Sequence, residues 1–162
     1  MEFMPVALAV GASLKKGQFV SYAMKIRLND GADKVFYLGF DRVVELTRAL
    51  AAKTQQLHTK GSFNTESSSQ ATLETENNYR KQDIQLTKDE VEDPDVNNVV
   101  HQLNAVLLDD SLLLNIIKHD KTEIDISVPD AAIEIFLGYM MNTLLTSGGE
   151  ALVSKVIAEI EK

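Results

Sequence analysis

Residues 19–57 read FVSYAMKIRLNDGADKVFYLGFDRVVELTRALAAKTQQL and carry the pattern of a β-hairpin that runs into a helix. Between residues 22 and 28, apolar side chains alternate with small or basic ones, which is typical of a strand with one buried face. Asn29-Asp30-Gly31 predicts the turn, because glycine accepts the positive φ of a tight reversal. We expect a return strand over residues 35–40 and a helix capped by Asp41.

The predicted helix has one apolar side and one charged side. We expect the apolar side to face the core and the charged side to face solvent. The inward residues are Val43, Val44, Leu46 and Leu50, and the outward residues are Arg42, Glu45 and Arg48.

A similar pattern returns at residues 112–145, LLLNIIKHDKTEIDISVPDAAIEIFLGYMMNTLL. A shift of 89 positions aligns Asp130 with Asp41 and Ile133 with Val44, whereas the strand before the turn fits better at a shift of 88. The second turn is therefore expected to be one residue longer. We interpret the pattern as internal duplication of a strand-strand-helix unit. The alternative is coincidence, since hairpins followed by helices are common.

The flanking segments extend both units. Residues 5–10 predict a first strand, at a sheet edge because of Pro5. Residues 95–108 fit either a helix or a strand, and the repeat favours a strand. The helix over residues 130–145 is apolar around most of its circumference, so we expect it at the centre of the fold or in an interface. The fold class is α+β: two related units with antiparallel hairpins, plus a C-terminal amphipathic helix.

The predicted organisation is a first unit over residues 1–57, a polar, acidic linker or loop over residues 58–93, and a second unit over residues 94–162. Within the linker, residues 83–86 predict a short strand, and Thr87 with Glu90 predicts a capping box. At 162 residues the chain is one ordinary domain or two lobes that share a core. Met1 and Met4 are both candidate translation starts.

Composition excludes several function classes. The chain contains no cysteine, which excludes thiol catalysis, thiolate metal sites and disulfides and favours a reducing, cytoplasmic location. No apolar run reaches the roughly 20 residues that a membrane helix needs. Zinc-protease, phosphate-loop, nucleophile-elbow and dinucleotide motifs are absent from the sequence, so we predict no catalytic residue, metal or cofactor. His119-Asp120, between Lys118 and Lys121, is interpreted as a solvated turn rather than a catalytic cluster.

Charge is distributed unevenly along the chain. The net charge is −8, but residues 1–60 carry +4 and residues 61–162 carry −12. One interpretation is that the two halves dock through complementary faces. The other is that the acidic part binds a basic partner, or the first part an anionic one.

These patterns predict a protein-protein interaction module, such as an inhibitor, adaptor or chaperone-like factor, whose partner has a basic surface; a homodimer through the terminal helix over residues 150–162 is a further option. The alternative is a nucleic-acid-associated regulator, and an enzyme of unrecognised type is third. The candidate partner-binding residues are Leu152, Val153, Val156, Ile157 and Ile160 of the terminal helix, with Asp89, Glu90, Glu92 and Asp93. The candidate nucleic-acid face is Lys15, Lys16, Lys25 and Arg27.

Overall fold

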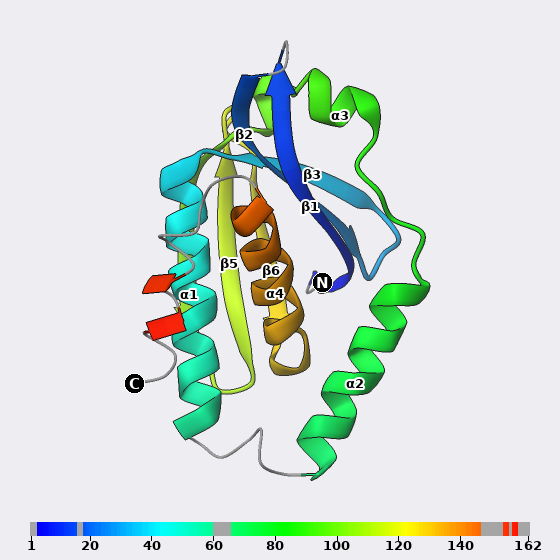
Figure 1. The fold of residues 1–162 in the computed structure, drawn as a ribbon, viewed down its shortest axis with the longest axis vertical. Coiled ribbons are helices and arrows are strands. Elements are labelled where there is room, and N and C mark those ends of the chain that lie inside the picture. Colours follow the sequence, from blue (N-terminus) through cyan, green and yellow to red (C-terminus); the bar gives the residue numbers. More distant parts are fainter. Residues whose placement is uncertain (1–2, 16–17, 60–65, 147–153, 156, 159–162) are drawn as a thin grey trace.

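Two three-stranded antiparallel sheets form the framework of the chain, in the α+β class that the sequence predicts (Figure 1). The computed structural model describes residues 3–15, 18–59, 66–146, 154–155 and 157–158. The elements are β1 (Pro5–Lys15), β2 (Gln18–Leu28), β3 (Asp33–Leu38), α1 (Phe40–Thr59), α2 (Glu66–Lys81), α3 (Lys88–Glu92), the 3-10 turn η2 (Val96–Asn98), β4 (Val100–Leu107), β5 (Ser111–Lys118), β6 (Glu123–Pro129) and α4 (Asp130–Thr146).

The first unit (β1, β2, β3 and α1) and the second unit (β4, β5, β6 and α4) have the same strand order, β1-β2-β3 and β4-β5-β6. They also share a register. Arg27 lies opposite Asp33 in the first hairpin, and Ile117 lies opposite Glu123 in the second, a displacement of 90 positions for both partners. The two turns are therefore equally long, and the expectation of a longer second turn is wrong. Shifts of 88 and 90 both preserve the inward and outward alternation, so hydrophobic pattern did not separate them.

Two further details recur in both units. The pairing of β1 with β2 shifts between Pro5 and Ala7, and that of β4 with β5 shifts between Val100 and Gln102. The second detail is a positive φ in each hairpin turn, 88° at Gly31 and 70° at Lys121, again 90 positions apart. These shared features are what duplication predicts, and duplication itself remains a hypothesis.

The core joins the two units. α1 packs against α4 and β4, while α4 packs against β1. One hydrophobic cluster includes Met24, Phe36, Leu46, Leu114 and Phe136, so residues of both units share it. α4 is buried on most sides, as predicted. No helix in the described part of the chain is both long and apolar enough to cross a membrane.

Each unit also pairs with the start of the other unit through the edge of its third strand. Tyr37 of β3 forms a parallel bridge with Val99, just before β4, and Ile126 of β6 forms one with Phe3, just before β1. The prediction that the first strand lies at an edge is confirmed. The choice of a strand for residues 95–108 is confirmed over Val100–Leu107, which form β4.

The segment at residues 58–93 differs from the predicted linker. α1 extends to Thr59, and α2 occupies Glu66–Lys81. The polar composition concealed this helix because its main anchor is tertiary: Tyr79 is buried, its ring lies edge-on to Phe136 at 6.5 Å, and its hydroxyl donates to the Pro5 carbonyl at 3.1 Å. Residues 83–86 form no strand, which corrects that prediction. The capping box of Thr87 and Glu90 is confirmed.

Two smaller outcomes concern the other helices. α1 begins at Phe40, so Asp41 lies in the first turn rather than at the cap, where its carboxylate still favours the positive end of the helix dipole. For the predicted terminal helix, residues 154–155 and 157–158 are helical and Ile157 is exposed. Leu152, Val153, Val156 and Ile160 lie outside the described residues.

Candidate functional site

The outer face of the first sheet is covered by residues 82–93, which we call the strap. Lys25 of β2 makes the central contact: its Nζ donates to the Glu90 carboxylate at 2.9 Å and to the Gln85 carbonyl at 3.0 Å. The side chains of Lys25 and Glu90 are 12% and 23% exposed, so this ion pair is largely shielded from water. Dissolved salt screens a shielded ion pair less than a surface pair, so this pair helps to hold the strap in place.

Contacts from all three strands hold the rest of the strap. Tyr37 of β3 donates its hydroxyl to the Glu90 carbonyl at 2.7 Å, and Ser13 of β1 donates to the Val91 carbonyl at 2.8 Å. A Cβ added to Gly11 would lie 2.9 Å from Leu86 Cδ1. Glycine at this position therefore permits the strap to approach the sheet closely.

Ionisation of the strap is coupled to this contact. Burial raises the pKa of Glu90, but hydrogen bonds from the Thr87 backbone and from Lys25 outweigh it, and the pKa lies below its ordinary value. Burial, followed by the negative charge of Glu90, raises the pKa of Tyr37. At neutral pH the strap therefore presents a carboxylate to Lys25, and its Glu90 carbonyl accepts a hydrogen bond from the neutral Tyr37 hydroxyl.

The strap brings together two sets of residues that the sequence analysis assigned to different partners. Lys25, from the candidate nucleic-acid face, pairs with Glu90, from the candidate partner-binding cluster. Arg27 forms a bidentate ion pair with Asp33: Nε donates to Oδ1 at 2.8 Å and Nη2 donates to Oδ2 at 3.1 Å. This pair lowers the pKa of the Asp33 carboxyl. Lys16 and the side chain of Lys15 lie outside the described part. The remaining acidic candidates, Asp89, Glu92 and Asp93, are exposed.

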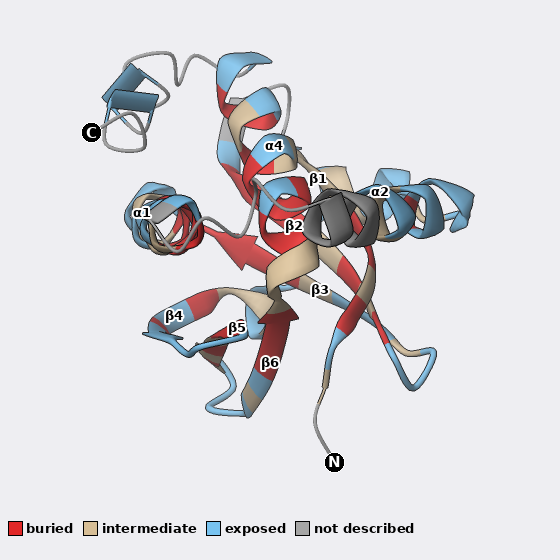
Figure 2. Ribbon diagram, turned by 90° about the horizontal axis from the view of Figure 1, so that it is seen from below, coloured by how far each residue is buried: buried red, intermediate tan, exposed pale blue. Residues whose placement is uncertain are grey.

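The second sheet has a different outer face, which we call the open face. Its side chains are Gln102, Asn104 and Val106 of β4, Leu113, Asn115 and Ile117 of β5, and Glu123, Asp125 and the buried Ser127 of β6. α1 and α4 lie on the other side of this sheet, and no described helix covers the open face (Figure 2). Val106 is 50% exposed, and Glu123 and Asp125 are also exposed.

A ladder of polar side chains crosses the open face. Asn104 Nδ2 donates to Asn115 Oδ1 at 3.1 Å, and Asn115 Nδ2 donates to Asp125 at 2.7 Å and to Glu123 at 2.5 Å. One amide therefore holds two carboxylates next to each other. Each carboxylate keeps further lone pairs for a donor from outside, so the centre of the face is a negatively charged acceptor site. Sequence analysis did not select these residues, although Asn115 interrupts an otherwise apolar strand.

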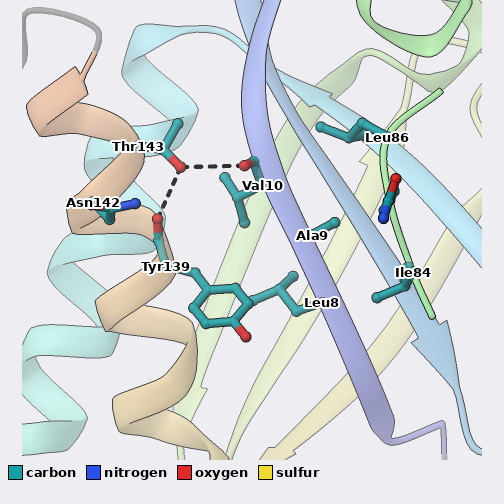
Figure 3. Close-up of a pocket in the computed structure, with 9 residues that line it drawn as sticks. Leu8, Ala9, Val10, Ile84, Leu86, Tyr139, Asn142 and Thr143 are labelled. Atoms are coloured by element: carbon teal, nitrogen blue, oxygen red, sulfur yellow. Dashed lines mark hydrogen bonds between the residues drawn. The ribbon is translucent and has the colours of Figure 1, made fainter. Parts of the chain in front are cut away.

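A groove runs between β1, the strap and α4 (Figure 3). Its volume is about 510 Å³. Thr143 in its wall donates to the Val10 carbonyl at 3.4 Å and to the Tyr139 carbonyl at 2.9 Å. The described lining residues are Leu8, Ala9, Val10, Ile84, Gln85, Leu86, Tyr139, Asn142 and Thr143. Because these include no carboxylate, amine or imidazole, the lining lacks the usual pair for acid-base catalysis.

The His119-Asp120 cluster forms part of a hairpin turn. Asp120 Oδ1 accepts the Thr122 N–H at 2.9 Å, as Asp30 Oδ1 accepts the Ala32 N–H at 2.9 Å in the first unit. The Thr122 hydroxyl and backbone lower the pKa of Asp120. His119 Nδ1 lies 3.0 Å from His101 Nε2, and both side chains are exposed. Because Asp30 plays the same part in the other unit, the geometry indicates a turn-forming role for Asp120.

The second feature that sequence analysis missed is a buried lysine. The Lys53 side chain of α1 is 0% exposed, and its Nζ contacts the Leu108 carbonyl and, at 3.2 Å, the Asp130 carboxylate at the start of α4. This cation therefore ties α1 to the second unit. Lys53 lies three residues after Leu50, on the same helix face as the buried Val43, Leu46 and Leu50, and this spacing could have predicted that Lys53 is buried.

Comparison with known proteins identifies a family for the chain. No curated protein and no solved structure matches it. A family model described as YjeJ-like matches residues 1–161, almost the whole chain. The description names no activity, ligand or partner. The protein therefore belongs to the YjeJ-like family.

Proposed function

We propose that the protein is a non-enzymatic protein-interaction module that binds a basic segment of a partner protein on the open face of β4, β5 and β6. The observation that carries the proposal is the difference between two equivalent faces. The first sheet has the strap on its outer face, whereas the described residues place no segment on the outer face of the second. An exposed sheet face with apolar and charged residues side by side is a common interaction surface.

The charge of the expected partner follows from the same comparison. In the first unit the sheet supplies the cation, Lys25, and the strap supplies the anion, Glu90. Asn115 stands 90 positions after Lys25 and holds the carboxylates of Glu123 and Asp125. The sign is reversed, so lysine or arginine on the partner is complementary. The net charge of −12 over residues 61–162 adds long-range attraction for such a segment.

The nucleic-acid alternative has less support. Lys25 and Arg27, its described members, are each paired with a carboxylate. Phosphate binding would have to displace Glu90 and Asp33, which lowers the gain from each contact. The proposal includes a cytoplasmic location, in keeping with the absence of cysteine. Inhibitor, adaptor and chaperone-like roles are all compatible with it.

The test is selection of binders from a displayed library of random twelve-residue peptides, followed by affinity measurements on two variants with the same loss of charge. Glu123→Gln with Asp125→Asn neutralises the open face. Asp89→Asn with Glu92→Gln neutralises exposed carboxylates of α3 and serves as the control. We expect lysine- or arginine-rich peptides whose dissociation constant rises at least roughly tenfold in the open-face variant and less than roughly twofold in the control.

The same measurement can contradict the proposal in two ways. Equal losses in both variants would indicate attraction by net charge rather than a site. A loss confined to the α3 variant would move the site to Asp89 and Glu92, the candidates from the sequence. Raising the salt concentration should weaken binding to the wild type more than to the open-face variant.

A further inference from the structure

The outer edge of β4 is contacted by described residues at its two ends and not at its centre. Of the strands at sheet edges, β3 is bridged by Val99 and β6 by Phe3. The Pro5 and Val10 carbonyls of β1 accept hydrogen bonds from Tyr79 and Thr143. In the described part, side chains contact the backbone of β4 only near its two ends. Arg42 donates to the His101 carbonyl at 3.0 Å, and Lys53 contacts the carbonyl of Leu108, the residue after β4.

The direction of the β4 backbone groups follows from its hairpin. The Leu108 N–H donates to the Ser111 carbonyl at 2.9 Å, so Leu108 and Ser111 form a hydrogen-bonded pair. Hydrogen-bonded and non-hydrogen-bonded pairs alternate along an antiparallel ladder. The N–H and C=O groups of Val106 and Asn104 therefore point to β5. Those of Leu103, Ala105 and Leu107 point away from it.

The side chains of β4 do not protect this edge. VHQLNAVL contains no lysine, arginine, carboxylate or proline, the devices that usually block an edge. The register shift is confined to the segment between Val100 and Gln102, so the remainder is regular. Leu107 and Leu108 are 39% and 41% exposed. Ala105, in the centre, is exposed and too small to shield the backbone beside it.

We infer that the β4 edge binds an extended segment of a partner protein as an added strand, paired with the backbone of Leu103, Ala105 and Leu107. The inference extends the proposed function, because it rests on a protein partner, but it concerns a separate site beside the open face. The two ends of the edge differ in charge. Arg42 at the start of β4 is paired with Glu45 at 2.8 Å, whereas the exposed Asp110 follows the end of β4, so a segment with a basic residue beside Asp110 is complementary.

A second copy of the chain fits this edge less well. α1 packs against β4 more extensively than against β5. Pairing of two β4 strands would place the strands about 4.8 Å apart. The α1 helices of the two copies, each packed against its own β4, would then be forced close to each other. Packed helices need about 8–10 Å between their axes. An isolated strand carries no helix and meets no such obstacle.

The test uses peptides from the displayed library that bind the wild type and still bind the Glu123→Gln, Asp125→Asn variant. Their affinities are measured on Ala105→Pro, which removes an outward N–H, and on Ala105→Ser, which keeps it. Proline is tolerated on edge strands where the N–H faces solvent. We expect binding to Ala105→Ser as to wild type, and binding to Ala105→Pro at least roughly tenfold weaker.

A second measurement does not depend on a protein variant. N-methylation of alternate peptide groups divides each peptide into two series, and only one series should lose binding, because one set of groups in a strand faces β4. Equal effects of the two series, or affinity unchanged by Ala105→Pro, would overturn the inference and leave the open-face proposal standing. So would wild-type dimers that Ala105→Pro converts to monomers in sedimentation, because the edge would then belong to a second copy. Failure to find any binding peptide would count against both proposals.

Discussion

The two sheets share a register but differ in what lies on their outer faces. Lys25, Tyr37 and Ser13 of the first sheet are bound by the strap. Asn115 in the second sheet, 90 positions after Lys25, binds its neighbours Glu123 and Asp125 within the sheet. A polar strand residue thus has two ways to satisfy its hydrogen bonds, from a covering segment or from lateral neighbours. The lateral solution leaves a face available to another molecule.

The largest effect is expected at the junction that both units need. Lys53→Met removes the buried cation and leaves the Asp130 carboxylate and the Leu108 carbonyl without it. The Asp130 Oδ1 that contacts Lys53 is buried without a hydrogen-bond partner among the described residues, while the side chain as a whole is 33% exposed, so we expect a loss of about 3 kcal/mol, the lower limit for a broken buried pair. Urea unfolding measures it. Lys53→Met with Asp130→Asn should recover part of the loss, and full stability of the single variant would contradict a structural role for the pair.

The next effect distinguishes the covered face from the open one. Gly11→Val places branched carbon atoms where Leu86 of the strap lies, 2.9 Å from the new Cβ. We expect a loss of about 1–2 kcal/mol in urea unfolding. The matched control is Val106→Ile, because Val106 stands at the corresponding position of β4 on the open face, and enlarging it should change stability by less than about 0.5 kcal/mol. Leu86→Ala should restore part of the loss in Gly11→Val.

Acid should loosen the strap. The pKa of Glu90 is lowered in the folded protein from an ordinary value of 4.5. A lowered folded pKa means that the carboxylate stabilises the fold at pH values above the ordinary pKa, and that this contribution disappears as the pH falls through the folded pKa. We expect Glu90→Gln to be less stable than wild type by about 1 kcal/mol at pH 7, and this difference to disappear as the pH falls through the folded pKa of Glu90. A stability difference that does not shrink as the pH is lowered below 4.5 would contradict this origin.

Lys25→Met is the companion variant for that experiment. It removes the cation but keeps Glu90 and its hydrogen bond from the Thr87 backbone. The stability of Lys25→Met should therefore fall less than that of the wild type between pH 7 and pH 3. It should still fall, because the hydrogen bond from the Thr87 backbone to Glu90 remains. An equal fall in both proteins would show that the ion pair contributes nothing to the pH dependence.

The smallest effect on stability is expected on the open face. Asn115→Thr removes the amide that holds Glu123 and Asp125 but keeps a good strand residue. Solvent can replace the lost hydrogen bonds, so stability should change by less than about 0.5 kcal/mol. Binding of basic peptides should nevertheless weaken. A loss of several kcal/mol would mean that the ladder stabilises the fold, and the ladder would then no longer support a binding site on the open face.

Local patterns were enough for much of the fold. The alternation in residues 22–28, the Asn29-Asp30-Gly31 turn and the Thr87–Glu90 capping box depend on neighbours in sequence, and the structure contains each of them. Strands β5 and β6 and the burial of α4 also followed from hydrophobic pattern, whereas β4 followed from the repeat. The strap contact did not follow, because Lys25 and Glu90 are 65 positions apart and sequence analysis assigned them to different partners.

The sequence by itself determined the α+β class, the hairpins and the central helix, because side-chain periodicity and turn residues act over a few positions. Tertiary structure decided the shift of 90 rather than 88, since both keep the same residues inside. It also decided the helix at Glu66–Lys81, whose Tyr79 is buried against Phe136 and Pro5. Above all, it decided which outer face is covered, because a strap can be recognised only where distant segments meet.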